Sequence, residues 1–203
     1  MSTDRVIVLA AGRGLRAGGP KALHRVHNRP WWHIQRKRLA LVGLPAIWVV
    51  SERVRASMTE HGGPPPDSVI ADELSPMFTS VLAGCTAIAE LHRSTRGVFI
   101  LPVDVPAPNP TVFNTLARAT AHPSAVAAAL PTHNSQRGHP VYLSWPLVTS
   151  RLLSPSTPAD SRLDHLIEDA RVEVPVTDPG VLINLNTADD FTAWANVEYI
   201  RPE

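Results

Sequence analysis

The chain has 203 residues, a net charge of +1 and 44% hydrophobic residues, which predicts a single domain over residues 1–203 with a sizeable core. The balanced charge argues against nucleic acid or a membrane surface as a partner, and we expect neither a signal peptide nor a membrane-spanning stretch. The single cysteine, Cys85, excludes an internal disulfide and indicates a reducing compartment such as the cytoplasm.

The first half of the chain alternates short apolar runs with segments of helical periodicity. The runs are rich in β-branched residues and are bounded by turn-forming residues, as buried strands are. The segment 78–92 has small residues on the face that a helix would pack. We therefore predict strands at residues 5–10, 45–51, 68–72 and 97–104, and helices at residues 31–43, 52–63 and 78–92.

The second half continues this alternation. Pro110 stands at the first position of a helical pattern, where proline is favoured. Asn186 or Thr187 can cap a last helix that has acidic residues in its first turn. The stretch 130–160 is the least regular and can form an insertion over the edge of the sheet. We predict strands at residues 124–131, 139–144, 171–176 and 181–186, and helices at residues 110–121, 162–170 and 187–197.

Strands that alternate with helices predict an α/β fold with a mostly parallel central sheet. In such sheets, ligands bind beyond the carboxyl ends of the strands. Residues 11–21, Asp72, Asp104 and residues 184–186 all lie at or just beyond the end of a predicted strand. We therefore expect these four segments to meet at one edge of the sheet.

The glycine-rich stretch after the first strand, AAGRGLRAGGPK, has the composition of an anion-binding loop. A Walker phosphate loop is excluded, because Pro20 interrupts the Gly-Lys pair and removes an amide. A dinucleotide fingerprint is formally present at Gly12, Gly14 and Ala17. However, no helical pattern begins within it, and no acidic residue ends a second strand at the spacing that the fingerprint needs.

A third pattern, L-A-A-G-x-x-x-R-x-G-x-x-K, fits residues 9–21, and four further segments follow in order: PMFTSVLAG, LPVDVP, RGHPVYLS and INLNTADDF. Together they resemble the signatures of the MobA-like NTP transferase family, the nucleotidyltransferases of the molybdenum-cofactor type, and most of all its molybdopterin cytidylyltransferases. The resemblance implies a Rossmann-like, three-layer α/β/α fold of the nucleotide-diphospho-sugar transferase type. The sequence departs from the family pattern at Pro76 and Phe78. It also departs at Asn184 and Asn186, two positions where aspartates usually stand.

The resemblance implies a Mg²⁺-dependent nucleotidyltransferase that moves NMP from an NTP to a small phosphorylated acceptor such as molybdopterin and releases pyrophosphate. Arg16 and Lys21 would neutralise phosphate charge. Asp104 would hold Mg²⁺, with Asn186 as a weaker ligand. His139, in a Gly-His-Pro setting, would contact the acceptor. The expected nucleotide-binding residues are Leu9, Ala10, Ala11, Gly12, Arg13, Gly14, Asp72 and Ser80.

The sequence indicates the base of the nucleotide and the identity of the acceptor less clearly. Members of the family that use CTP tend to carry L-A-A-G where GTP users carry L-A-G-G, so Ala11 favours CTP. Related enzymes with the same scaffold act on a sugar phosphate, phosphocholine or an isoprenoid precursor. An NAD-binding oxidoreductase and a non-catalytic nucleotide-binding protein remain alternatives, the latter because Asn184 and Asn186 replace acids. Asp104 and Asn186 can also serve only as a turn former and a helix cap, and His139 as a structural loop residue.

Overall fold

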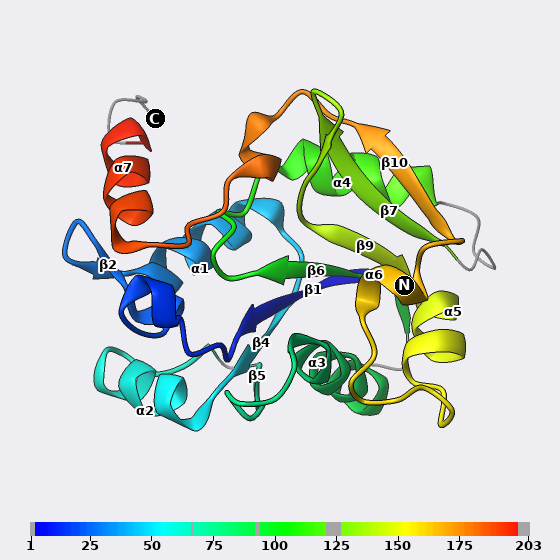
Figure 1. The fold of residues 1–203 in the computed structure, drawn as a ribbon, viewed down its shortest axis with the longest axis horizontal. Helices are drawn as coiled ribbons and strands as arrows, with labels where there is room; N and C mark the ends of the chain where they lie inside the picture. The colour runs from blue at the N-terminus through cyan, green and yellow to red at the C-terminus, as the bar shows by residue number, and fades with distance from the viewer. Residues whose placement is uncertain (1–2, 66, 92–93, 121–126, 199–203) are drawn as a thin grey trace.

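A computed structural model describes residues 3–65, 67–91, 94–120 and 127–198, and its centre is an eight-stranded sheet (Figure 1). The strand order is β10-β7-β9-β6-β1-β4-β5, and β8 pairs with β7. All strands of that path are parallel except β9, which runs antiparallel to both neighbours. The strands are β1 (Thr3–Ala10), β4 (Ala46–Val50), β5 (Ser68–Ile70), β6 (Thr95–Pro102), β7 (Ala128–His133), β8 (Gln136–Arg137), β9 (Val141–Ser144) and β10 (Arg171–Pro175).

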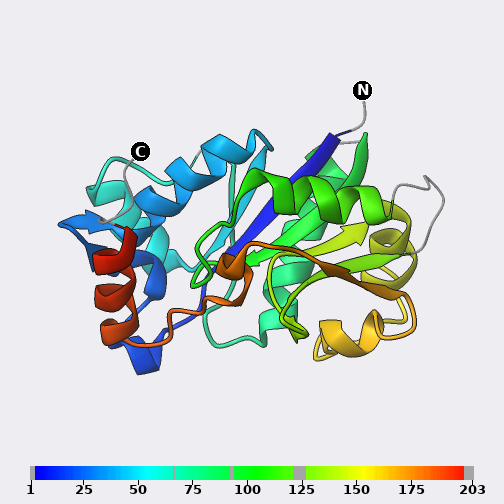
Figure 2. The ribbon, with the colours of Figure 1, turned by 90° about the horizontal axis from the view of Figure 1, so that it is seen from above.

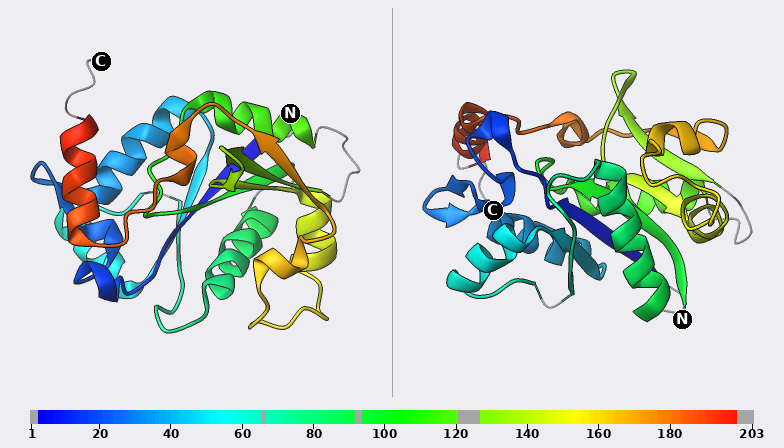
Figure 3. Two further views of the ribbon diagram at one scale, coloured as in Figure 1. Left: turned by 45° about the horizontal axis from the view of Figure 1, so that its top comes forward. Right: turned by 60° about the horizontal axis from the view of Figure 1, so that its bottom comes forward.

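Helices cover both faces of this sheet and complete three layers, as predicted (Figures 1 and 2). One face carries α1 (Trp31–Val42) and α4 (Pro110–Ala119), and the other carries α3 (Met77–Leu91) and α5 (Trp145–Leu147). The remaining helices are α2 (Glu52–Glu60), α6 (Leu163–Leu166) and α7 (Ala188–Glu198). The carboxyl ends of β1 and β6 point toward the side of the molecule where α7 stands (Figure 3). None of the helices in the described ranges is long and apolar enough to cross a membrane.

Strand β1 is a continuous aliphatic run because both of its faces are buried. Val6 and Val8 belong to the apolar cluster that includes α1 and α4, whereas Ile7 and Leu9 belong to the cluster that includes α3. Successive side chains of a strand point to opposite faces, so a strand covered on both sides must be apolar at every position. The run therefore reflects burial on both faces.

Helix α3 approaches the sheet closely because its packed face consists of small residues, as its sequence predicted. A Cβ atom at Gly84 would come within 2.6 Å of Ile7 Cγ2, so glycine allows the helix to contact β1. The neighbouring Cys85 is fully buried, and burial raises the pKa of its thiol to about 12. Cys85 is therefore a packing residue.

The prediction of a strand at residues 181–186 is wrong. Residues Pro179–Leu182 form a 3-10 turn, η4, because Asp178 Oδ1 accepts a hydrogen bond from the amide of Gly180 at 2.8 Å. The chain then runs without sheet pairing across the ends of the strands, and the amide of Leu185 donates to the carbonyl of Asp104 at 2.9 Å. The segment is thus attached to the edge of the sheet where the site was expected.

Other departures concern short elements. The predicted helix at residues 162–170 is limited to α6, and residues 130–160 are not an insertion, because they contribute β7, β8 and β9 to the sheet. The hairpin of β2 (Arg25–Val26) and β3 (Arg29–Pro30), and the π-helical turn η3 (Val148–Leu152), were not predicted. The start of the predicted strand at residues 124–131 lies outside the described residues.

Candidate active site

A cavity of about 530 Å³ lies at the carboxyl ends of β1, β5 and β6. Its walls come from the loop after β1, the loop after β5 and the first turn of α3. The predicted residues on its lining are Leu9, Ala11, Gly12, Gly14, Arg16, Lys21, Asp72, Ser80 and Asp104. A larger cavity of about 850 Å³ between α1, α7 and residues 106–111 contains none of them. The smaller cavity is therefore the candidate site.

The loop after β1 folds back on itself through left-handed glycines. Gly14 has a φ of 60° and Gly18 has a φ of 78°. The carbonyl of Gly14 accepts hydrogen bonds from the amides of Ala17 at 2.9 Å and Gly19 at 3.1 Å. A Cβ at Gly14 would come within 1.9 Å of the Gly19 carbonyl oxygen, so only glycine fits there. At Gly12 a Cβ would meet nothing within 4 Å, which leaves this part of the backbone open to a ligand.

A pair of glycine substitutions separates the two reasons for glycine in this loop, which are the left-handed backbone and the lack of space for a side chain. We expect Gly14→Ala to weaken the binding of a nucleoside triphosphate by roughly tenfold or more, because the methyl group would push the loop open. The matched control is Gly18→Ala, which carries a similar backbone strain but meets no atom within 4 Å. Titration calorimetry of both variants measures the difference. Equal losses of affinity in both would contradict the role of the loop's closed shape.

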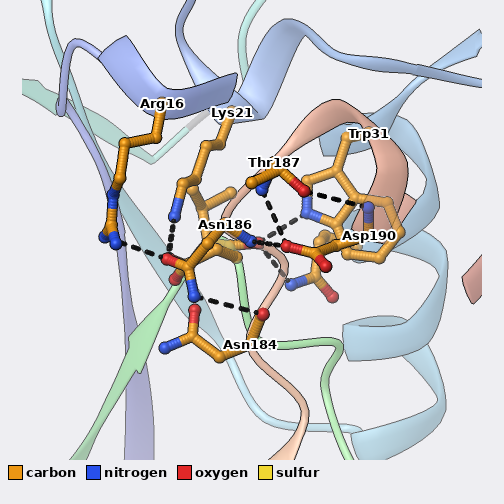
Figure 4. Close-up of polar contacts among 10 residues, drawn as sticks. Arg16, Lys21, Trp31, Asn184, Asn186, Thr187 and Asp190 are labelled. Atoms are coloured by element: carbon orange, nitrogen blue, oxygen red, sulfur yellow. Dashed lines mark hydrogen bonds and ion pairs between the residues drawn. The ribbon is translucent and has the colours of Figure 1, made fainter. Parts of the chain in front are cut away.

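Arg16 and Lys21 of this loop meet the side chains of Asp104 and Asn186, which come from distant parts of the chain. Figure 4 shows Arg16 and Lys21 pointing toward Asn186. Lys21 Nζ lies 2.5 Å from Asp104 Oδ2 and 2.9 Å from Asn186 Oδ1. Arg16 Nη2 donates to the same Asn186 oxygen at 3.2 Å. Lys21 and Asp104 have only 14% and 17% of their side chains exposed, so water screens their charges less than on an open surface.

Buried side chains of α1 hold the loop that carries Asp104. Trp31 Nε1 donates to the Val103 carbonyl at 2.5 Å, and Gln35 Nε2 donates to the carbonyls of Val103 at 3.0 Å and Val105 at 2.6 Å. Trp31 and Gln35 are both fully buried. Because the carbonyls on either side of Asp104 are held in this way, its backbone is fixed while its carboxylate faces Lys21.

Asn186 is held by the cap of α7, with Thr187 as the capping residue. Asp190 Oδ2 accepts hydrogen bonds from the amides of Asn186 and Thr187, both at 2.8 Å, and the amide of Asp190 donates to Thr187 Oγ1 at 3.2 Å. This reciprocal arrangement is a capping box. The hydrogen bonds from the two amides hold the pKa of Asp190 below its ordinary value.

The hydrogen bonds of this cap imply that its contribution to stability depends on pH. We expect Asp190→Asn to lower the free energy of unfolding near neutral pH, because the amide accepts these hydrogen bonds less strongly than the carboxylate. Because the pKa of Asp190 is depressed in the folded state, the wild type has this stabilisation above pH 3.8, the ordinary pKa of an aspartate. It loses the stabilisation as the pH falls through the folded-state pKa. The difference between the two proteins should therefore shrink in acid.

Denaturant unfolding at several pH values measures that difference. The matched control is Asp189→Asn, which changes an exposed acid in the same helical turn. A gap between wild type and Asp190→Asn that stays constant across the pH range would contradict the assigned cause.

The oxygen donors of the site fit a hard divalent cation. Asp104 Oδ2 and Asn186 Oδ1 approach the same point, the ammonium nitrogen of Lys21. Carboxylate and amide oxygens are ligands that Mg²⁺ and Mn²⁺ accept. Within the described residues, no group of three or more His, Cys, Asp or Glu side chains is placed to hold a metal alone. A cation held by these two oxygens would replace the Lys21 ammonium between them and would take further ligands from substrate phosphates and water.

The model of the MobA-like NTP transferase domain matches residues 6–173. The chain belongs to the MobA-like NTP transferase family. It is accordingly a nucleotidyltransferase, an enzyme class that binds a nucleoside triphosphate and a small acceptor. The alternative of a dinucleotide-binding oxidoreductase is also at odds with the loop, because 3-10 turns at Leu15–Ala17 and Lys21–Leu23 follow β1 where that fingerprint requires a helix.

Solved structures share the fold of this MobA-like transferase. A nucleotidyl transferase of Methanothermobacter superposes with a TM-score of 0.73 at 20% identity over 96% of both chains. Protein A of molybdopterin-guanine dinucleotide biosynthesis from Archaeoglobus fulgidus gives 0.71 at 16% identity, over 97% of this chain and all of the other. The Rv0371c protein of Mycobacterium tuberculosis, in complex with manganese, gives 0.67 at 17% identity, over 97% and 100%. No curated protein sequence matches the chain.

The remaining predicted residues of this MobA-like transferase lie outside the cavity lining. Asn186 reaches the cavity through its contacts with Arg16 and Lys21. The side chain of Ala10 is buried in the cluster on the opposite face of the sheet, because it alternates with the side chain of Ala11. Arg13 is exposed and is not part of the cavity wall.

His139 lies in a second cavity of about 530 Å³, which shares Met77 with the first. Its lining combines apolar side chains, among them Phe78, Leu130 and Val141, with charged ones such as Arg137 and Arg162. Nδ1 of His139 is shielded from solvent and has no hydrogen-bond partner within the described parts of the chain. Burial lowers the pKa of His139, although the Asp104 carboxylate opposes the shift, so the imidazole is neutral near pH 7.

Glu73 lines the nucleotide cavity of this MobA-like transferase but was not among the predicted site residues. Glu73 lies on the cavity wall next to the predicted Asp72, in the loop after β5. The available signal was its position, because the residues that follow the carboxyl end of a parallel strand line the ligand crevice.

Proposed function

We propose that this transferase moves CMP from CTP to a small phosphorylated acceptor, such as a molybdopterin, and releases pyrophosphate. We further propose that residues 1–203 form one domain for this reaction. The observation that carries the proposal is the convergence of Arg16, Lys21, Asp104 and Asn186 beside an open glycine-rich loop. Cations for phosphates stand next to oxygen ligands for a metal, which is the arrangement that phosphoryl chemistry needs.

In this reaction an oxygen of the acceptor phosphate attacks the α-phosphorus of CTP. The bond from that phosphorus to the oxygen bridging the β-phosphate breaks, and its electron pair leaves with pyrophosphate. A phosphate nucleophile is already ionised, so the protein contributes position and charge. Arg16 steadies the departing pyrophosphate through its planar fork of donors. Lys21 neutralises charge at the α-phosphate.

Asp104 and Asn186 would hold Mg²⁺, which neutralises phosphate charge when bound. The amide oxygen of Asn186 carries no net charge, so we expect weaker metal affinity than two carboxylates would provide. The manganese complex of the Mycobacterium tuberculosis protein supports a divalent cation in a site of this fold.

The second cavity is the proposed acceptor site. It adjoins the first cavity at Met77, so an acceptor bound there would lie next to the nucleotide. The neutral imidazole of His139 offers the acceptor a hydrogen-bonding nitrogen rather than a positive charge. The apolar part of the lining favours an acceptor with a ring system over one that carries only hydroxyl groups.

The preference for CTP rests on Ala11, which lies on the cavity lining. The Archaeoglobus fulgidus protein, which serves molybdopterin-guanine dinucleotide biosynthesis, points instead to a guanine nucleotide for that protein. A thermal-shift panel of CTP, UTP, GTP and ATP with Mg²⁺ decides between the bases, and we expect the largest shift with CTP. Pyrophosphate should then appear only when CTP, Mg²⁺ and a phosphorylated acceptor are all present. Binding of a triphosphate without pyrophosphate release on any acceptor would contradict the proposed reaction.

A further inference from the structure

The loop between β5 and α3 places two neighbouring carboxylates on the wall of the nucleotide cavity, and they differ in their partners. Asp72 Oδ1 accepts from the amide of Leu74 at 3.0 Å, and its Oδ2 accepts from the Ser75 hydroxyl at 3.4 Å. Glu73 Oε2 is shielded from solvent and has no hydrogen-bond partner among the residues that the structure describes. A shielded acceptor without a donor costs free energy, which a donor on a bound ligand would recover.

The charges of the cavity indicate which half of a nucleotide approaches Glu73. The cations of the lining, Arg16 and Lys21, belong to the loop after β1 and are bound to Asn186 and Asp104. Glu73 forms no ion pair with either of them within the described ranges. A triphosphate would be attracted to the cations and repelled by a carboxylate. The nucleoside half of a bound nucleotide is therefore the half expected beside Glu73.

The wall beside this carboxylate suits a base. Leu9 and Ala11 line the same cavity as Glu73, and both belong to a buried apolar cluster. Apolar lining side chains suit the face of a nucleobase, whereas a ribose presents hydroxyl groups that would need polar partners. The terminal torsion of glutamate is soft, so either carboxylate oxygen can meet a donor in the cavity.

We propose that Glu73 reads the base by accepting a hydrogen bond from an exocyclic amino group on its Watson–Crick edge. The proposal rests on the proposed function, in which the base is cytosine and the group is its 4-amino group. A carboxylate is an acceptor only, so it pairs with the amino group of cytosine and repels the O4 atom of uracil. A site that depends on such a hydrogen bond discriminates against the analogue that lacks the donor.

The variant Glu73→Gln tests this role. The glutamine amide has the same shape but contains both a donor and an acceptor, so it can pair with cytosine and with uracil. We expect the ratio of CTP to UTP affinity to fall by about tenfold, toward one. Titration calorimetry with the magnesium nucleotides measures the ratio without an acceptor. The matched control, Glu60→Gln, changes an exposed glutamate of α2 and should leave the ratio unchanged.

Four outcomes decide the proposal. An unchanged CTP-to-UTP ratio in Glu73→Gln overturns it, and so does a change confined to the ratio of CTP to 2′-deoxy-CTP, which would assign Glu73 to the ribose. A wild type that prefers GTP refutes the proposed use of CTP, but Glu73 is then tested by the ratio of GTP to ITP, which lacks the 2-amino group. The proposed role predicts that Glu73→Gln lowers that ratio as well. A wild type that binds no triphosphate overturns both proposals.

Discussion

Replacing Lys21 with alanine is expected to lower the turnover of CTP and acceptor by roughly a hundredfold to a thousandfold, the range seen when one group that stabilises a transition state is removed. Lys21 is the cation that lies between Asp104 Oδ2 at 2.5 Å and Asn186 Oδ1 at 2.9 Å. In the proposed reaction, its removal would leave the α-phosphate without a neutralising charge. Pyrophosphate release under saturating substrate measures the loss.

The fold should tolerate Lys21→Ala, because the ion pair borders a cavity that water can enter. We expect the free energy of unfolding to fall by about 1–3 kcal/mol, between the losses typical of exposed and of buried ion pairs. The control is Lys37→Ala, which removes the only other lysine of the chain from an exposed position on α1. Normal turnover in Lys21→Ala would show that the glycine-rich loop and its lysine are not the phosphate site.

Replacing Asp104 with asparagine is expected to raise the Mg²⁺ concentration needed for half-maximal activity by roughly tenfold or more. Asp104 supplies the one carboxylate of the proposed metal site, since its neighbour Asn186 contributes a neutral amide oxygen. The substitution also removes the ion pair with Lys21, so maximal turnover should fall too. Titration of pyrophosphate release against Mg²⁺ separates the two effects.

The same titration on Asp67→Asn provides the control, because that exposed aspartate precedes β5 and lies outside the cavity lining. A metal titration curve for Asp104→Asn that superposes on the wild type would remove Asp104 from the metal site. Rescue of part of the lost activity by Mn²⁺, which binds more tightly to the same ligands than Mg²⁺, would support its assignment.

The long elements of the fold could be predicted because their signals are local. The aliphatic run of β1 and the small-residue face of α3 each lie in one contiguous segment. The strand expected at residues 181–186 failed for the opposite reason. Its alternating apolar residues look like a strand, but Asp178 and Gly180 form a turn, and the amide of Leu185 donates to Asp104, just beyond β6, instead of to a sheet partner. Whether a segment of this kind pairs in the sheet depends on its tertiary contacts and not on its own residues.

The candidate site could be predicted only in part. Family signatures indicated Lys21, Asp104 and Asn186, and the structure places these side chains together. Glu73 has no signature, and its interest comes from an oxygen that is shielded without a partner. Whether a carboxylate is engaged, as Asp72 is, or lacks a donor depends on how its loop folds.

The amino-acid sequence by itself determined the family, the alternation of strands and helices, and the glycine-rich loop after β1, because each is carried by neighbouring residues. Only the tertiary structure decided that Lys21 meets Asp104 and Asn186, which stand 83 and 165 residues farther along the chain. It also decided that the turn before α7, and not another strand, brings Asn186 there. The physical reason is that local patterns select the conformation of a segment, whereas contacts between distant segments follow from the order in which the strands pair and from the burial of both faces of the sheet.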